Sequence, residues 1–324
     1  MGRYLLRRLF YVIPTMFFVS VLVFLLVRFI PGNVVDMMVA EMGGGGAAGV
    51  NREAAVEILT RRLGLDVPIP RQYARWISDV FRGDLGQSLW TNKSISADIL
   101  EQLPVSLELG CMAMLLSLVF SLPIGIFSAM RQETWGDYAG RTVSILAISI
   151  PALWLGTTVM VYPSIWWNWT PPVEYIPFGE NMGGNILQFL LPASIMGLGL
   201  AGMTMRMTRT MMLEVLRQDY IRTAWSKGLK ELTIVRRHAL KNAFIPILTV
   251  IGNQFPILIG ESAVLEQIFG LPGIGRYLVN ALLTRDYPVI SGVTLVMTGF
   301  IMAVNIMVDI LYIYLDPRLR YDYK

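Results

Sequence analysis

Apolar residues are gathered into six long runs along the chain, and the charged residues cluster between them. A helix needs roughly 20 residues to cross the apolar core of a bilayer, which is about 30 Å thick. Six segments meet this length, namely 9–29, 104–129, 143–163, 187–209, 243–265 and 288–315. The pattern therefore predicts an all-α polytopic membrane protein with six transmembrane helices.

The same pattern divides the chain into regions. We expect a short tip with the first span in residues 1–30, a long loop over 31–103, the other five spans over 104–315, and a tail over 316–324. The run Gln72–Phe81 has the periodicity of an amphipathic helix, so the long loop should fold into a small cap. No small-residue cleavage site follows the first apolar run, so we expect this span to be retained.

Composition agrees with a membrane location. The chain is 54% hydrophobic and 15% charged, with a mean hydropathy of +0.55, whereas soluble domains carry about 25% charged residues. The single cysteine, Cys111, excludes an internal disulfide.

The distribution of Lys and Arg predicts the orientation. With the N-terminus inside, 17 of the 27 Lys and Arg residues fall on the inner segments 1–8, 130–142, 206–242 and 316–324. Short loops on the inner side of a membrane are enriched in these residues, while long loops such as 31–103 are largely exempt. We therefore expect a multi-pass protein of the inner or plasma membrane with both termini in the cytoplasm. Its expected non-protein partner is membrane lipid, and no nucleic acid is expected.

Candidate catalytic chemistry is sparse. The sequence has no G-x-x-x-x-G-K-[ST] phosphate loop, and its only histidine is His238. No Asp, Glu, His or Cys residues have metal or hydrolase spacing, so we predict no catalytic residue, no metal site and no cofactor bound by this chain. Glu108 and Asp309 lie inside apolar runs, where an ionisable residue is a candidate for the transport pathway.

The segment between the fourth and fifth spans, residues 210–242, is longer than a connection requires. Residues 211–227 favour a helix, Gly228 can adopt the left-handed conformation in which many helices end, and a second helix is expected over 231–242. Pro246 falls near the start of the fifth span, where the first turn of a helix tolerates proline.

Two interpretations of this glycine corner are open. A basic amphipathic segment can lie on anionic lipid headgroups, and a compact corner can instead receive another protein. The small apolar surface of Ala224, Trp225, Gly228 and Leu229, ringed by basic residues, favours protein docking.

Residues 219–246, DYIRTAWSKGLKELTIVRRHALKNAFIP, resemble the EAA loop of binding-protein-dependent ABC importer permeases. Ala224 fits the second alanine of that pattern, Gly228 its glycine, and Ile245 with Pro246 its closing aliphatic-proline pair. Arg222 and Thr223 replace the Glu and the first Ala, a departure typical of the oligopeptide/dipeptide subfamily.

Three further stretches resemble that subfamily, in the right order: RYLLRRLFYVIPTMFFVSVLVFLLVRFIPGN, GLDVPIPRQYARWISDVFRGDLGQSL and IFGLPGIGRYLVNALLTRDYPVI. The long outer loop resembles that of the first of the two usual permease subunits.

The resemblance implies a type I ABC importer permease with a cytoplasmic coupling helix. Expected partners are a second, similar permease, two cytoplasmic ATP-binding subunits that hold ATP and Mg, and an outer solute-binding protein. The residues that would dock on the ATPases are Arg222, Thr223, Ala224, Trp225, Gly228, Leu229, Ile245 and Pro246. Closure of the ATPases on ATP would pull the docked helices together and turn the cavity outward.

The sequence alone leaves other functions as alternatives. A secondary transporter driven by an ion gradient would use Glu108 and Asp309 as proton carriers, although one long basic loop and the lack of paired midplane acids disfavour it. A membrane scaffold that transports nothing is a further alternative. Among substrates the family favours peptides, with glutathione, nickel complexes and sugars as alternatives.

Overall fold

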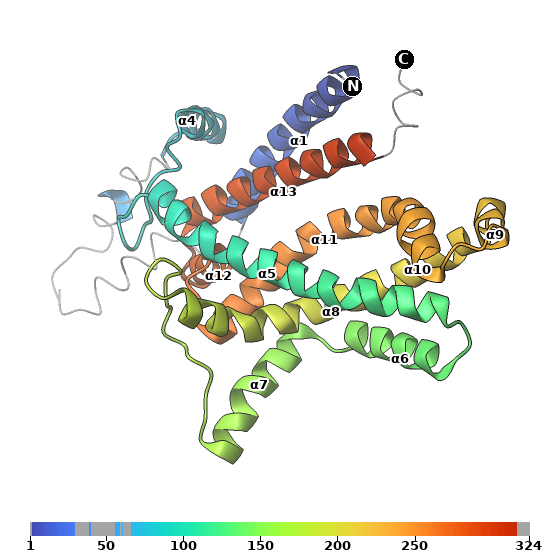
Figure 1. The fold of residues 1–324 in the computed structure, drawn as a ribbon. Helices are drawn as coiled ribbons and strands as arrows, with labels where there is room; N and C mark the ends of the chain where they lie inside the picture. The colour runs from blue at the N-terminus through green and yellow to red at the C-terminus, as the bar shows by residue number, and fades with distance from the viewer. Residues whose placement is uncertain (1, 30–38, 40–55, 59, 61–65, 316–324) are drawn as a thin grey trace. The chain divides into compact units, whose positions relative to one another are not determined.

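In the computed structural model the described residues are 2–29, 39, 56–58, 60 and 66–315, and their named elements are all helices (Figure 1). One isolated β-bridge joins Gln87 to Ser94. The expected tail 316–324 and much of the first half of the loop 31–103 lie outside these residues. The chain divides into two compact units. Unit 1 comprises Met1–Arg8, Gln102–Arg276 and Phe300–Lys324, and unit 2 comprises Leu9–Glu101 and Tyr277–Gly299.

Unit 1 contains most of the helices. Its elements, some of which continue into unit 2, are α5 (Ile95–Met130), α6 (Trp135–Ser149), α7 (Ala152–Trp167), α8 (Met182–Leu216), α9 (Asp219–Ser226), α10 (Glu231–Thr233), η1 (Ile234–Ala239), α11 (Leu240–Phe269), α12 (Ile274–Thr284) and α13 (Tyr287–Leu315). Its core forms around α8 and α11, whose buried side chains include Phe189, Met196 and Leu265.

Unit 2 packs the predicted cap helix against the first apolar helix. The amphipathic run of the sequence forms α4 (Ile69–Phe81), which confirms that prediction. Its Tyr73 and Trp76 rings lie 5.2 and 5.6 Å from the Phe24 ring of α1 (Gly2–Phe29), and the Tyr73 hydroxyl shares a 2.8 Å hydrogen bond with Ser20.

Two polar contacts within unit 2 involve α12 and the residue before α13, one with the segment before α5 and one with the first turn of α5. Ser88 Oγ donates to Asp286 at 2.6 Å, and the Tyr277 hydroxyl donates to Asp98 at 2.9 Å. Burial raises the pKa of Tyr277, and the Asp98 carboxylate that accepts its hydrogen bond raises it further. Tyr277 therefore stays a neutral donor at physiological pH.

The prediction of an all-helical membrane protein is confirmed. Four helices of the described residues are long and apolar enough to cross a membrane, namely Ile95–Met130, Met182–Leu216, Glu231–Phe269 and Tyr287–Leu311. The bent pair α6 and α7 makes a fifth if it is counted as one span. Within the part of α1 whose side chains the structure describes, the apolar stretch is Phe10–Leu25, which is shorter than these.

The structure differs from the expected third span, 143–163. This stretch is divided between α6 and α7, which meet at an angle of 86°. Ile150 is extended, with φ −90° and ψ 117°, because the ring of Pro151 disfavours a helical conformation in the residue before it.

The expected continuous helix over 211–227 is also broken. α8 ends at Leu216, Gln218 is extended with φ −71° and ψ 148°, and α9 starts at Asp219. Neither Gly nor Pro causes this break. Packing overrides helix propensity, because Met212 before the break and Ile221 after it are both completely buried.

A single helical path runs from Glu231 to Phe269, so the expected second helix, 231–242, continues into the fifth span without a break. Its residues Ile234–Ala239 form a π-helical turn. Buried side chains downstream recur every four residues at Ala239, Ala243 and Ile247, a spacing slightly longer than an α-turn of 3.6 residues. The wider π-turn compensates for this drift and keeps Val235 on the same buried face.

Helices of unit 1 approach one another closely at glycines. A Cβ atom on Gly197 of α8 would lie 2.7 Å from the Ala113 carbonyl oxygen of α5, and one on Gly202 would lie 2.7 Å from the Ser144 carbonyl oxygen of α6. Ser144 Oγ also donates to the Gly202 carbonyl oxygen at 2.8 Å. Small residues allow such close approach between helices in lipid, where the hydrophobic effect gives no drive for association.

Replacing Gly197 with Ala should destabilise the bundle, because the new methyl group would clash with backbone. We expect the free energy of unfolding to fall by about 1–3 kcal/mol, measured by SDS titration of the purified protein in micelles. Gly199→Ala is the matched control in the same helix, since nothing lies within 4 Å of its added Cβ. An equal loss in both variants would contradict the close crossing.

Candidate functional site

Helix α9 is held against the rest of unit 1 by one apolar face. Ile221 and Ala224 are 0% and 6% exposed, and they belong to the same core cluster as Ile234, Val235 and Ala239 of η1. Asn242 Nδ2 donates to the Tyr220 hydroxyl at 2.8 Å, which adds a polar contact from α11. α9 is therefore attached to the helix that continues into a candidate span.

A glycine ends α9 as the sequence predicts. Gly228 has φ +71°, in the left-handed region. Its N–H donates to the Trp225 carbonyl at 2.9 Å, and Leu229 N–H donates to the Ala224 carbonyl at 3.4 Å. These two bonds form a Schellman motif, which satisfies helix-end carbonyls and turns the chain sharply towards α10.

The other face of α9 is exposed. Trp225 is 46% exposed, and Arg222 and Thr223 are also on the surface. Arg222 Nη1 pairs with Asp219 Oδ1 at 3.5 Å, and Thr223 Oγ1 donates to the Asp219 carbonyl at 3.0 Å. An exposed tryptophan beside an arginine is the composition found in the energetic centres of protein interfaces.

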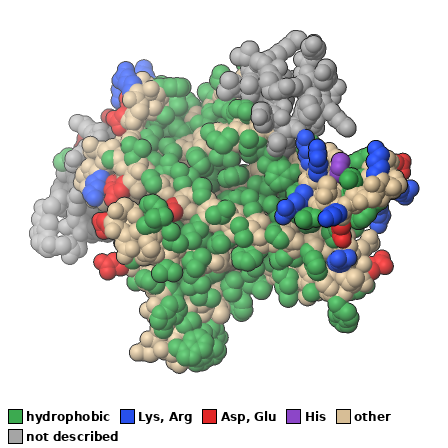
Figure 2. Space-filling view, in the orientation of Figure 1, with side chains coloured by type: hydrophobic (Ala, Val, Ile, Leu, Met, Phe, Trp, Pro, Cys, Tyr) green, Lys and Arg blue, Asp and Glu red, His purple; other side chains and the backbone are tan. Residues whose placement is uncertain are grey.

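Basic residues surround this corner. Lys227, Lys230, Arg236 and Arg237 are all exposed. Figure 2 shows Lys and Arg side chains gathered around His238, next to a broad hydrophobic surface of the neighbouring helices. The exposed face of α9, the glycine corner and these basic residues are together called the α9 corner below.

The predicted docking residues do not all share this surface. Trp225, Gly228 and Leu229 are exposed together at the α9 corner, but Ala224 faces inward and packs in the core. The expectation of a surface alanine is wrong, because Ala224 lies one helical turn from Ile221 on the buried stripe. Ile245 and Pro246 are half-buried within α11, beyond Asn242.

The two predicted intramembrane acids lie on different helices. Glu108, in α5, is half-buried and interacts with the side chain of Asn185 in α8. Burial and the negative charge of Glu108 raise the pKa of Tyr175, in the loop before α8. Asp309 is half-buried in α13. Among the described residues no group of three or more His, Cys, Asp or Glu side chains could hold a metal ion.

Sequence reasoning missed a buried ion pair. Asp137 of α6 is completely buried, and it accepts bonds from Arg209 Nε at 2.7 Å and Nη2 at 2.8 Å. Ser128 Oγ and the Glu133 N–H donate to the same carboxylate. Arg209 is at the end of an apolar run and Asp137 is in the polar connection 130–142, so a sequence signal for the pairing exists only in their opposite signs.

A second buried carboxylate, Glu266, lies just beyond the expected fifth span, 243–265. Glu266 is 0% exposed near the end of α11 and accepts from Ser106 Oγ at 2.6 Å and from Arg276 N–H at 2.8 Å. Ser106 Oγ in turn accepts from Ile274 N–H at 2.9 Å. Glu266 thus caps the start of α12, and an added Cβ on Gly273 would clash with its carboxylate.

Taken together, long apolar helices, close glycine crossings and an exposed amphipathic helix packed on the start of a membrane helix define a polytopic membrane protein. The chain matches two families. Residues 121–321 match the binding-protein-dependent transport system inner membrane component, and residues 1–110 match the N-terminal region of binding-protein-dependent transport system membrane components.

The chain therefore belongs to the family of binding-protein-dependent transport system inner membrane components, as its resemblance predicted. It is a non-catalytic permease subunit of a multi-pass inner-membrane importer. Membership of this family implies ATPase subunits and a binding protein as partners.

Relatives cover the whole chain. A putative peptide transport system permease protein of Brucella abortus (strain 2308) is 39% identical over 98% of this chain and 99% of its own length. The glutathione transport system permease protein GsiC of Pectobacterium atrosepticum is 35% identical over 99% of this chain and 100% of its own. The di/tripeptide transport system permease protein DppB of Pseudomonas aeruginosa is 36% identical over 98% and 99%.

The fold is shared with a solved transporter. A chain of the MetNI methionine ABC transporter, in an inward-facing conformation, superposes with a TM-score of 0.55 and 16% identity. The match covers 68% of this chain and 96% of the MetNI chain.

Replacing Ile221 with Ala should loosen α9 from η1. Removing a fully buried isoleucine side chain costs about 2–5 kcal/mol, so amide hydrogen exchange over residues 219–229 should become faster. Ser226→Ala, on the exposed face of the same helix, should leave that exchange unchanged. Equal protection in the wild type and Ile221→Ala would show that this face does not hold α9.

Proposed function

We propose that this chain is the first of two permease subunits in an ATP-driven importer of peptides or a similar solute such as glutathione. A second, similar permease would complete the pathway, and an outer solute-binding protein would deliver the substrate. The observation that carries the proposal is the α9 corner, an exposed Trp-Arg surface fixed to a helix that continues into a span. The names of relatives support the substrate class, since they refer to peptides, di/tripeptides and glutathione.

The proposed topology has six spans and both termini in the cytoplasm. The Lys and Arg distribution supports this orientation, and α1 together with the α6–α7 pair would supply the first and third spans. Residues 31–103 then form the extracytoplasmic cap, residues 210–242 the cytoplasmic coupling loop, and residues 316–324 a cytoplasmic tail.

The proposed energy source is ATP bound with Mg on two cytoplasmic ATPase subunits, and this chain itself holds no cofactor. Each ATPase would contact one permease, here through Arg222, Thr223, Trp225, Gly228 and Leu229. Three of the predicted residues lie behind the proposed docking surface. Ala224 packs α9 against the core, and Ile245 with Pro246 lies within α11.

Force applied to the α9 corner would pass directly into the membrane. α9 is packed on η1, and the helical path from η1 to Phe269 has no break. Movement of an ATPase on nucleotide binding would therefore pull α11 as a lever and change the access of the pathway. A mobile loop at this position would absorb the movement instead.

Gly228→Glu should uncouple ATP hydrolysis from uptake. Because Gly228 is at φ +71° with nothing within 4 Å of an added Cβ, any substitution costs conformational energy but meets no clash within the chain. Bulk and charge at an interface should reduce substrate uptake by roughly tenfold or more. The measurement is uptake and ATPase activity of the assembled complex in proteoliposomes.

Gly228→Ala is the matched control, since it adds the same backbone strain without the bulk or charge. It should retain most of the uptake. If Gly228→Glu and Gly228→Ala transport equally well, the docking assignment is wrong.

The energy source separates an importer from a secondary transporter. Uptake into proteoliposomes should require ATP inside and should persist when an ionophore collapses the proton gradient. Glu108→Gln and Asp309→Asn should then keep the ATP requirement. Uptake without ATP that stops on collapse of the gradient would support an ion-driven carrier instead.

A further inference from the structure

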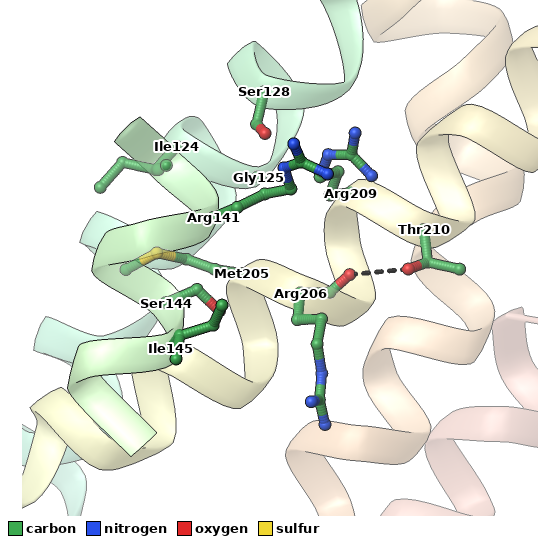
Figure 3. A pocket seen from close by; sticks show the side chains of 11 residues that line it. Ile124, Gly125, Ser128, Arg141, Ser144, Ile145, Met205, Arg206, Arg209 and Thr210 are labelled. Atoms are coloured by element: carbon green, nitrogen blue, oxygen red, sulfur yellow. Dashed lines mark hydrogen bonds between the residues drawn. The ribbon is translucent and has the colours of Figure 1, made fainter. Parts of the chain in front are cut away.

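A pocket in unit 1 opens between α5, α6 and α8, at the end of α8 that leads to α9 (Figure 3). Its volume is about 110 Å³. One wall is apolar, made by Ile124, Ile145 and Met205, and the other side carries guanidinium groups. None of the docking residues at the α9 corner lines it.

Positive charge exceeds negative charge at this pocket. The guanidinium groups of Arg141 and Arg209 lie together near Ser128, while Arg206 points away from them (Figure 3). Asp137 neutralises Arg209 through two short hydrogen bonds. Arg141 is 3.8 Å from the same carboxylate, and its side chain is 44% exposed. The Asp137 oxygens are already occupied by Arg209, Ser128 and Glu133, so the Arg141 charge can act on a ligand in the pocket.

The residues around the pocket have the composition found at the level of lipid headgroups. Trp135, at the start of α6, is 89% exposed, and Tyr138 lies one turn further with Arg141 stacked 4.7 Å from its ring centre. Exposed tryptophan and tyrosine beside arginine are typical of the boundary between membrane and water. An apolar wall next to a guanidinium group at this depth suits an amphiphile with an anionic head.

We propose that this pocket binds a phosphate group, with Arg141 as the main ligand and Arg209 behind it, and that the phosphodiester of an anionic membrane lipid is the natural source. Arginine binds phosphate oxygens with charge-assisted, bidentate hydrogen bonds. The Ile124, Ile145 and Met205 wall would contact the glycerol and the first part of an acyl chain. Basic pockets between membrane helices bind anionic headgroups in this manner. A bound lipid would join the α5–α6 turn to α8.

The test uses the purified permease complex in nanodiscs of phosphatidylcholine that contain increasing fractions of phosphatidylglycerol. Native mass spectrometry counts the phosphatidylglycerol molecules that stay bound to this chain. Arg141→Gln should weaken this retention by roughly tenfold, the size expected for one charge-assisted contact. Arg131→Gln, which changes an exposed arginine in the turn between α5 and α6, outside the pocket, should bind as the wild type does.

Two further arms identify the source of the phosphate. Inorganic phosphate added at millimolar concentration should fail to displace the lipid, because it cannot use the apolar wall. Displacement by inorganic phosphate in the wild type, but not in Arg141→Gln, would support the phosphate site and assign it to a free anion. Equal retention of phosphatidylcholine and phosphatidylglycerol, or equal loss in Arg141→Gln and Arg131→Gln, would overturn the proposal.

Discussion

Every backbone N–H and C=O within the apolar core of a membrane must find a partner in the protein, because lipid offers none. This constraint explains why the membrane segments are helical and where a helix can be interrupted. At the bend before α7, Ile150 N–H still donates to the Leu146 carbonyl at 3.2 Å, and the Pro151 carbonyl accepts from Leu155 N–H at 3.1 Å. The chain can therefore turn by 86° at Pro151 with these backbone groups partnered. The glycine crossings follow from the same environment, since helices in lipid hold together by close contact and not by removal from water.

The attachment of α9 connects the membrane helices to an exposed surface, which is the proposed docking site. One face of α9 is buried through Ile221 and Ala224, and the opposite face, which carries Trp225, is exposed. A helix as short as α9 is not stable alone in water, so its packing on η1 stabilises it. The glycine corner then reverses the chain within a few residues. In the proposed coupling, a helix packed on η1 would transmit movement to α11, whereas a flexible connection would absorb it.

The sequence predicted the class of fold and the place of the corner because both depend on local patterns. Apolar runs near the thickness of a bilayer marked the long helices, and Gly228 marked a left-handed helix end whatever surrounded it. Contacts between distant residues could not be predicted in this way. The break at Gln218 depends on burial of Met212 and Ile221, and the inward direction of Ala224 depends on η1, which is 10 residues or more away in the chain. Glu266 looked like a loop residue because nothing local indicates that Ser106 and the start of α12 enclose it.

The Asp137–Arg209 pair shows why buried charge occurs in such a bundle. A buried ion pair adds little stability relative to apolar residues, since desolvation offsets much of the attraction. Its contribution here is geometric. Arg209 donates from Nε and Nη2 to the two oxygens of one carboxylate, which restrains the rotation of α8 relative to α6. Ser128, near the end of α5, donates to the same carboxylate and so connects a third helix. A lysine at position 209 would supply the charge but not the planar pair of donors. Arg209 lies only seven residues before the end of α8, so this fork holds the part of α8 that precedes the break before α9.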